Sequence, residues 1–174
     1  LMTDKIQEII LKNATIEVKK LAIILNNQDS CYNYNPIDYG INETRFKAVE
    51  KRIEPLHYIA YISEDFDENI KDVKNIVNCN KSTFHLGSFS EEEILSYEKL
   101  KQLSLMEYNE LRKNLGINSE FSINVRYINR TEIKELEIIR TVIKGREVES
   151  KDLPLRIINN NADISEIILN IRSW

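Results

Sequence analysis

Two cysteines and two histidines are the residues of this 174-residue sequence whose side chains could carry redox or metal chemistry. The cysteines, Cys31 and Cys79, both lie in polar segments flanked by asparagine or serine. Buried structural cysteines usually lie in apolar runs, so this placement favours a disulfide over core packing. Two free thiols are the alternative interpretation.

A zinc site is a further interpretation of the same side chains. Cys31, His57, Cys79 and His85 form a formal Cys2His2 set. Zinc sites normally contain closely spaced ligand pairs, such as Cys-x2-Cys, and this set has none. We therefore predict no metal site, no cofactor and no catalytic residue.

A nuclease motif is suggested by Arg52 and His57, which match the Arg-x4-His spacing of the RNases called HEPN domains. Those domains are helical and carry the pair on a helix, whereas Pro55 would interrupt a helix here. Residues 56–62 instead indicate a buried strand, and His57 is predicted to be half-buried on it. RNA cleavage that depends on His57 is a remote third functional hypothesis.

Four Asn-x-Ser/Thr sequons could accept glycans if the protein is exported. Their asparagines are Asn13, Asn42, Asn80 and Asn129.

The first half of the chain is predicted to be mainly helical. Apolar residues at steps of three and four predict one long amphipathic helix over residues 3–26. Further helices are expected over residues 43–54 and 65–77, around the strand at 56–62. Residues 28–39 contain a proline and many asparagines, which indicates a loop.

The best-defined boundary lies in the middle of the chain. Ser90 and Glu93 have capping-box spacing, which predicts a helix start. The apolar spacing then continues to Leu115, either as one bent helix or as two short ones, and Gly116 is a plausible stop. Alternation over residues 121–128 predicts a strand with one buried face.

The C-terminal segments are predicted mainly as strands. Residues 133–144 are ambiguous, although their β-branched residues favour a strand. Residues 153–158 are a strand candidate, and Pro154 suggests an edge position. Residues 164–171 are also predicted as a strand, with a helix as the alternative.

These elements together predict an α+β fold in a single domain over residues 1–174. Its long N-terminal helix, 3–26, and further helices would pack on a mostly antiparallel sheet. That sheet would come mainly from the C-terminal half, where residues 90–174 form a helix-strand-sheet unit.

Composition narrows the classes of function. The net charge of −4 gives no reason to expect a nucleic-acid partner. The 4 glycines are too scattered for a glycine-rich phosphate loop. The longest unbroken apolar run, residues 21–25, is too short to cross a bilayer. Any membrane anchor would therefore lie outside this sequence.

A family resemblance rests on five short segments. They are Leu95 to Leu100 (LSYEKL), Tyr108 to Leu111 (YNEL), Leu115 to Ile117 (LGI), Phe121 to Val125 (FSINV) and Arg140 to Val142 (RTV). This pattern resembles archaeal pilin-like surface proteins with class III signal peptides. The resemblance implies a non-enzymatic domain at the cell surface, with protein partners that include copies of itself or other pilin-like subunits.

The leading hypothesis is thus an extracytoplasmic pilin-like or membrane-anchored domain, acting in assembly or adhesion through its helix stripe and sheet edges. The alternative is an intracellular ligand-binding or sensory domain, which is the expectation if Met2 is the native start. Its pocket would lie between the sheet and the helices, lined by a cluster of tyrosines. The tyrosines are Tyr32, Tyr34, Tyr39, Tyr58 and Tyr61.

Overall fold

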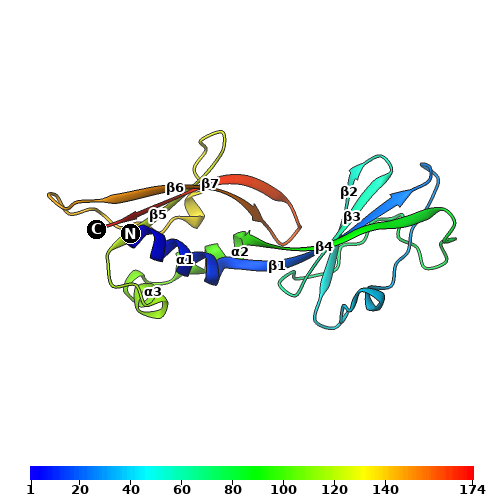
Figure 1. Ribbon diagram of the computed structural model, residues 1–174, viewed down its shortest axis with the longest axis horizontal. Helices are drawn as coiled ribbons and strands as arrows, with labels where there is room; N and C mark the ends of the chain where they lie inside the picture. Colours follow the sequence, from blue (N-terminus) through cyan, green and yellow to red (C-terminus); the bar gives the residue numbers. More distant parts are fainter. The chain divides into compact units, whose positions relative to one another are not determined.

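The computed structural model describes residues 1–174 and contains far more strand than helix (Figure 1). The helices are α1 (Met2–Ala14), α2 (Tyr97–Leu105) and α3 (Tyr108–Leu115), with short 3-10 helices η1 (Pro36–Tyr39) and η2 (Lys134–Leu136). The strands are β1 (Thr15–Leu25), β2 (Lys47–Glu54), β3 (His57–Ser63), β4 (Phe84–Ser96), β5 (Phe121–Tyr127), β6 (Glu149–Ile158) and β7 (Ile164–Ser173). They follow the order β2-β3-β1-β4-β6-β7-β5 in one mixed sheet of seven strands. The predicted α+β fold, with long helices packed on a C-terminal sheet, is wrong.

The predicted helix over residues 3–26 is wrong because it ends halfway. Helix α1 stops at Ala14, and Thr15 adopts an extended backbone with φ −89° and ψ 150°. The segment that follows is β1, in which Ile16 and Val18 are buried on alternate positions. The apolar stripe is ambiguous, because residues four positions apart lie on the same face of a helix and also on the same face of a strand. The β-branched residues of β1 favour the strand.

The chain divides into two compact units, each with its own core. The helical unit comprises Leu1–Thr15, Ile94–Asn159 and Asp163–Trp174. The disulfide unit comprises Ile16–Glu93 and Asn160–Ala162. Whether the two units behave as the single predicted domain stays a prediction.

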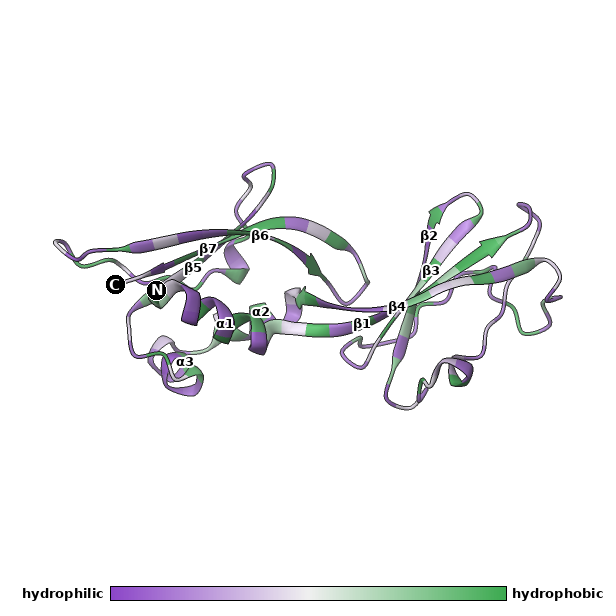
Figure 2. Cartoon of the chain, viewed as in Figure 1, coloured by the Kyte–Doolittle hydropathy of each residue, from purple (hydrophilic) through white to green (hydrophobic).

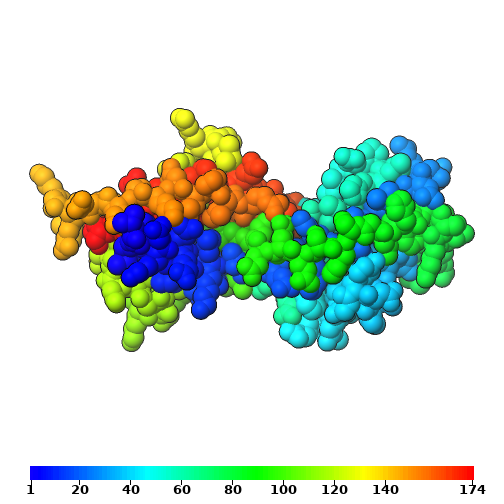
Figure 3. All heavy atoms as spheres, viewed as in Figure 1, coloured from blue at the N-terminus to red at the C-terminus, as the bar shows by residue number.

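In the helical unit, α1 packs on β6 and β7, and its blue atoms lie against the orange atoms of β6 in Figure 3. The apolar stripe of α1 is fully buried in this core through Ile6 and Ile10. Strand β5 pairs with β7, and Phe121, Ile123 and Val125 enter the same core, as its alternation predicted. Hydrophilic and hydrophobic residues both occur along β6 and β7 (Figure 2). In β7 the buried Ile167, Leu169 and Ile171 alternate with residues of the opposite face, which carries the polar Asn170 and Arg172.

The helix predicted to start at Ser90 is wrong, because β4 continues to Ser96. Helix α2 starts one residue later, where the Oγ of Ser96 accepts a hydrogen bond from the backbone N–H of Lys99 at 3.2 Å. Of the two alternatives for this region, two short helices is correct. Gly116 ends α3 in the left-handed conformation with φ 68°, as predicted.

In the disulfide unit, both predicted helices are wrong. Residues 43–54 contain strand β2, whose Val49 pairs with Tyr61 on β3. Residues 65–77 form no helix, and the Val73 and Val77 side chains that suggested one are 89% and 86% exposed. The strand predicted over 56–62 is present as β3, and His57 on it is half-buried, as predicted.

The C-terminal predictions are partly confirmed. Strand β7 spans the predicted strand over 164–171, and β6 includes the one over 153–158. Residues 133–144 instead contain η2 and irregular backbone, with an isolated antiparallel bridge between Ile123 and Ile138. Pro154 pairs with Ile168 on β7. On the other side of β6, β4 pairs only with Ile157 and Ile158, so Pro154 has no strand partner there, in agreement with the predicted edge position.

Candidate functional site

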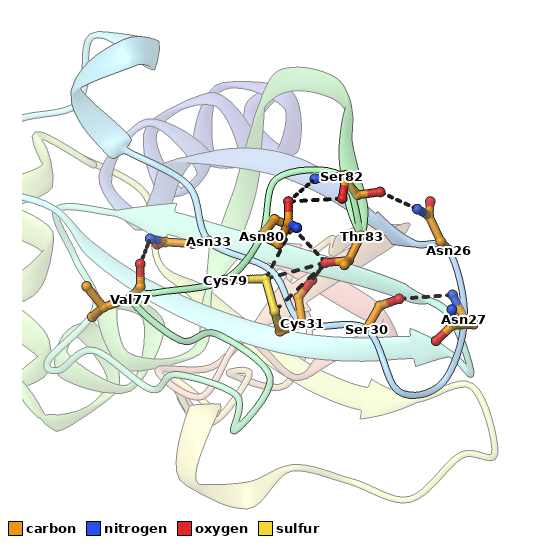
Figure 4. Close-up of a disulfide and its surroundings, with 10 residues drawn as sticks. All are labelled: Asn26, Asn27, Ser30, Cys31, Asn33, Val77, Cys79, Asn80, Ser82 and Thr83. Atoms are coloured by element: carbon orange, nitrogen blue, oxygen red, sulfur yellow. Dashed lines mark hydrogen bonds between the residues drawn. A yellow bond between two sulfur atoms is a disulfide. The ribbon is translucent and has the colours of Figure 1, made fainter.

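The disulfide between Cys31 and Cys79 is confirmed, with Cα atoms 5.7 Å apart. It joins the two long irregular connections of the disulfide unit, which precede β2 and follow β3 (Figure 4). Beside it, the Thr83 hydroxyl donates to the carbonyl of Cys31 at 3.1 Å. The Asn33 amide donates to the carbonyl of Val77, also at 3.1 Å. The bond therefore lies in a polar setting that fixes both connections.

A buried carboxylate lies in the same unit. Glu50 is 6% exposed and accepts hydrogen bonds from the Tyr32 hydroxyl at 3.0 Å and from the Asn75 amide at 2.8 Å. The Tyr32 ring packs against Tyr58 with centroids 5.3 Å apart. Burial raises the pKa of Glu50 above its ordinary value, although the hydrogen bonds from Asn75 and Tyr32 act in the opposite direction. The folded state therefore holds the Glu50 proton more tightly than the unfolded state does.

This shift predicts a pH-dependent stability that Glu50→Gln removes. As the pH rises from the ordinary glutamate value near 4.5, the unfolded state releases its proton before the folded state does. The free energy of unfolding of the wild type should therefore fall with pH until the raised pKa is passed. In Glu50→Gln this component is absent. We expect the stability difference, variant minus wild type, to grow as the pH rises above about 4.5, measured by urea unfolding.

The matched control is Glu54→Gln, which changes an exposed carboxylate on the same strand. The comparison shows whether a pH-dependent difference is specific to the buried position. A flat difference for Glu50→Gln would mean that the buried carboxyl keeps its ordinary pKa.

The formal zinc set and the nuclease pair are not assembled as functional sites. Both cysteines are in the disulfide and cannot supply thiolates, and no cluster of three or more His, Cys, Asp or Glu side chains could hold a metal ion. Arg52 and His57 lie on the β2–β3 hairpin, where Arg52 pairs with Tyr58 and His57 with Glu54. The helix that a HEPN-type pair requires is therefore absent.

The tyrosine cluster is divided between packing and cavity roles. Tyr32, Tyr58 and Tyr61 are buried in the disulfide unit. Tyr34 lines two cavities of about 230 and 490 Å³, and Tyr39 packs on Phe89 with ring centroids 5.1 Å apart. In the helical unit, the space between sheet and helices is filled by core side chains. A larger groove lies on the other face of this sheet.

A groove of about 660 Å³ lies on the polar face of the sheet in the helical unit. Its floor consists of two rows of side chains that cross β5, β7 and β6 in register. One row is Ser122, Arg172 and Ser150, and the other is Asn124, Asn170 and Asp152. These residues alternate with the buried positions of the same strands, so folding of the core places them together.

Hydrogen bonds fix the second row of the floor. Asn170 is 8% exposed, and its amide nitrogen donates to Asp152 at 2.8 Å and to Ser150 at 3.0 Å. Arg126 donates to the other oxygen of Asp152 at 3.2 Å. The amide of Asn170 first, and then Arg126, hold the pKa of Asp152 below its ordinary value. Asp152 is therefore an anion that accepts a hydrogen bond from the protein at each of its two oxygens.

The wall of the groove comes from the irregular segment after β5. Glu137 accepts a hydrogen bond from the amide of Asn124 at 3.1 Å, which ties the wall to the floor. Arg140 binds Glu120 at 3.2 Å and lies over the Tyr108 ring, with its guanidinium carbon 4.8 Å from the ring centroid. The wall is thus held in position by side chains on both strand and helix.

The sequence did not predict this groove. The alternation over β5 predicts a buried face from its apolar positions and places Ser122, Asn124 and Arg126 on the opposite face, without indicating what they contact. The signal was present in the polar residues at every second position. It became interpretable only when the pairing register placed Arg172 and Asn170 of β7 beside them.

The sequons differ in local structure. Asn42, Asn80 and Asn129 lie in exposed turns, where each Oδ1 accepts a hydrogen bond from the backbone N–H two residues later at 3.0 Å. Asn13 lies in helix α1 and donates instead to the carbonyl of Ile9 at 2.7 Å. Glycosylation of any of them stays a prediction.

We expect this difference to decide glycan occupancy when the chain is expressed in a host that glycosylates secreted proteins. Asn42, Asn80 and Asn129 should be occupied to a large extent, and Asn13 to a much smaller extent, because a folded helix does not offer its amide in a turn. Site-by-site mass spectrometry of glycopeptides provides the measurement. Occupancy of Asn13 equal to that of the other three would contradict this.

Comparisons with known proteins place the chain in no described group: no protein family, no curated protein and no solved structure matches it. None of its helices is both long and apolar enough to cross a membrane. The pilin-like resemblance therefore stays a prediction.

Proposed function

We propose that this chain is a non-enzymatic, extracytoplasmic recognition domain that binds a ligand in the groove on the polar face of β5, β6 and β7. The observation that carries the proposal is the double row of polar side chains on the groove floor, in which hydrogen bonds hold the row of Asn124, Asn170 and Asp152 in place. A volume of about 660 Å³ is within the range of small-ligand sites.

The extracytoplasmic location is supported by the disulfide. Stable disulfides form and persist in oxidising compartments and are rare in reducing ones. The Cys31–Cys79 bond joins two connections that otherwise have little regular structure. A reducing compartment would leave these connections without their covalent link.

Recognition in the groove is favoured over assembly through the outer strands β2 and β5, because other segments of the chain pair with part of each of them. Along β2, Glu50 donates to the carbonyl of Ile70 at 2.8 Å, and Ile70 donates to that of Ala48 at 2.9 Å. Along β5, Ile123 and Ile138 exchange backbone hydrogen bonds of 2.8 and 2.9 Å. Covered edges do not readily pair with another chain. The helix stripe is buried as well.

A non-enzymatic role agrees with the lowered pKa of Asp152, a carboxylate on the groove floor. A general base acts best with a pKa near the working pH. The pKa of Asp152 is lowered by Asn170 and Arg126, which moves it away from that range. Binding requires no such proton transfer.

The proposal is tested by screening the purified, oxidised protein against an array of immobilised saccharides, short peptides and organic acids. The wild type is compared with Arg172→Ala and Asn124→Ala, two groove variants. Arg146→Ala is the control, since Arg146 is an exposed arginine outside the groove. We expect one ligand class to be retained by the wild type and the control and lost by both groove variants. If no class shows this pattern, the groove is not a recognition site.

The location is tested separately. Cells of the source organism are treated with iodoacetamide before lysis, and the chain is then analysed by mass spectrometry without reduction. An extracytoplasmic protein should carry no alkyl group on Cys31 or Cys79. Alkylation of both would place the native chain in a reducing compartment.

A further inference from the structure

We infer that the groove binds a carboxylate-bearing saccharide and that Arg172 binds its carboxylate; this assignment rests on the proposed function. The inference concerns the ligand class, which the fold alone does not define. Three properties of the groove support it: a cation whose side chain has no bonded partner, a second such cation in the same lining, and a floor rich in hydrogen-bonding groups.

The cation is Arg172, at the centre of the first row. It is exposed and lies in register between Ser122 and Ser150, and its side chain forms no ion pair or hydrogen bond in the structure. The nearby Asp152 interacts with it through charge but is bonded to Asn170 and Arg126 instead. A guanidinium group presents parallel donors that match the two oxygens of a carboxylate. Arg172 is therefore free to bind a carboxylate in this fork geometry.

The charges that line the groove favour an anion. They are Arg126, Arg130, Arg140 and Arg172 against Glu132, Glu137 and Asp152. The Arg126 and Asp152 charges neutralise each other at 3.2 Å. Arg130, which has a positive φ of 71° in the turn after β5, adds a second cation with no bonded partner. Arg140 is paired with Glu120 at 3.2 Å, so the cations whose side chains have no bonded partner, and which an incoming anion would meet, are Arg130 and Arg172.

The floor favours a saccharide over an acidic peptide. Asn124 and Asn170 each donate through the amide nitrogen, which leaves Oδ1 of both available to accept from ligand hydroxyls. The apolar residues of the lining are isoleucines, and two of them, Ile123 and Ile138, are buried. Peptide recognition is usually dominated by apolar anchors that fill pockets, and this floor offers none. A ligand with many hydroxyl groups matches it better.

The test is a titration of isotope-labelled protein with three probes, followed by amide chemical shifts. The probes are a trimer of galacturonic acid, the corresponding neutral trimer of galactose, and a hexa-aspartate peptide. We expect the acidic trimer to shift the amides of Ser122, Asn124 and Arg172. The neutral trimer should bind at least about tenfold more weakly, the effect of losing a charge-assisted hydrogen bond.

Two substitutions of Arg172 test whether binding depends on its positive charge alone or also on the paired donors of its guanidinium group. Arg172→Ala should weaken binding of the acidic trimer about tenfold or more, and Arg172→Lys should recover only part of the loss, because lysine lacks the paired donors. Arg146→Ala should bind as the wild type does. The amide spectra of the free variants show whether each has kept the fold.

The outcomes test the acidic-saccharide ligand separately from the proposed recognition function of the groove. Equal binding of the neutral trimer would overturn the role of the carboxylate, and preferential binding of the peptide in the groove would overturn the saccharide class. In both cases the groove would remain a recognition site. Shifts confined to residues outside the groove would overturn the inference, and the array then decides whether the proposed function fails with it.

Discussion

Replacing both Cys31 and Cys79 with serine is expected to lower the free energy of unfolding by about 4 kcal/mol. The bond closes a separation of 48 residues, and the chain-entropy description of disulfides gives this magnitude for a loop of that size. Without the bond, the unfolded chain gains conformations that the link had excluded. Urea unfolding of the double variant against the oxidised wild type gives the measurement.

The effect should be concentrated in the disulfide unit. Tyr32 donates a backbone hydrogen bond to Lys74 at 2.9 Å, and Ile76 donates one to Tyr32 at 3.1 Å, so hydrogen exchange of both amides should accelerate most. Reduced wild-type protein serves as the control, since it lacks the bond but keeps the sulfur atoms. It should resemble the double variant. A loss below about 1 kcal/mol would show that the connections are fixed without the link.

The second large effect is expected for Phe121→Ala in the helical unit, with a loss of about 3–5 kcal/mol. Phe121 is fully buried, and its ring packs against that of Tyr108 with centroids 5.5 Å apart. Truncation removes this contact and leaves a cavity between β5 and α3. The backbone hydrogen bonds of Phe121 with the Tyr108 hydroxyl, at 2.8 and 3.0 Å, do not need the side chain, so the variant should still fold.

Phe89→Ala is the matched control, because Phe89 also packs on a tyrosine but is only half-buried. It should cost clearly less than Phe121→Ala in urea unfolding at the same pH. A loss for Phe121→Ala no larger than that of the control would mean that neighbouring side chains close the cavity.

Local signals in the sequence were most reliable where one pattern had one interpretation. The alternation over β5, the stop at Gly116 and the strand β7 are all present as predicted. The polar placement of Cys31 and Cys79 favoured the disulfide that the structure contains. Each of these rests on residues close together in the chain, or on a residue type with few alternatives.

The errors arose where spacing alone was ambiguous. Over residues 15–25, positions four apart fit a helix and a strand equally well, and the pairing of β1 with β3 decides between them. The capping box at Ser90 had the right residue types, but Glu91 and Glu92 pair with Lys19 and Lys20 on β1 at 2.6 and 3.0 Å. Contacts far apart in sequence thus overrode local preference, and a single sequence does not reveal them.

The groove was unpredictable for the same reason. Its floor takes residues from positions 122–126, 150–152 and 170–172, which meet only through strand register. None of these residues is unusual in a strand that faces solvent. Their arrangement, rather than their type, makes the site.

The Cys31–Cys79 bond has a further consequence for resistance to proteases. Irregular connections such as those before β2 and after β3 are where proteases cut most readily. Both cysteines lie in these connections, so one cut anywhere between residues 31 and 79 leaves two fragments that are still joined through sulfur. A nicked molecule would keep its pieces together, and its groove, which is built from residues after position 121, would be intact.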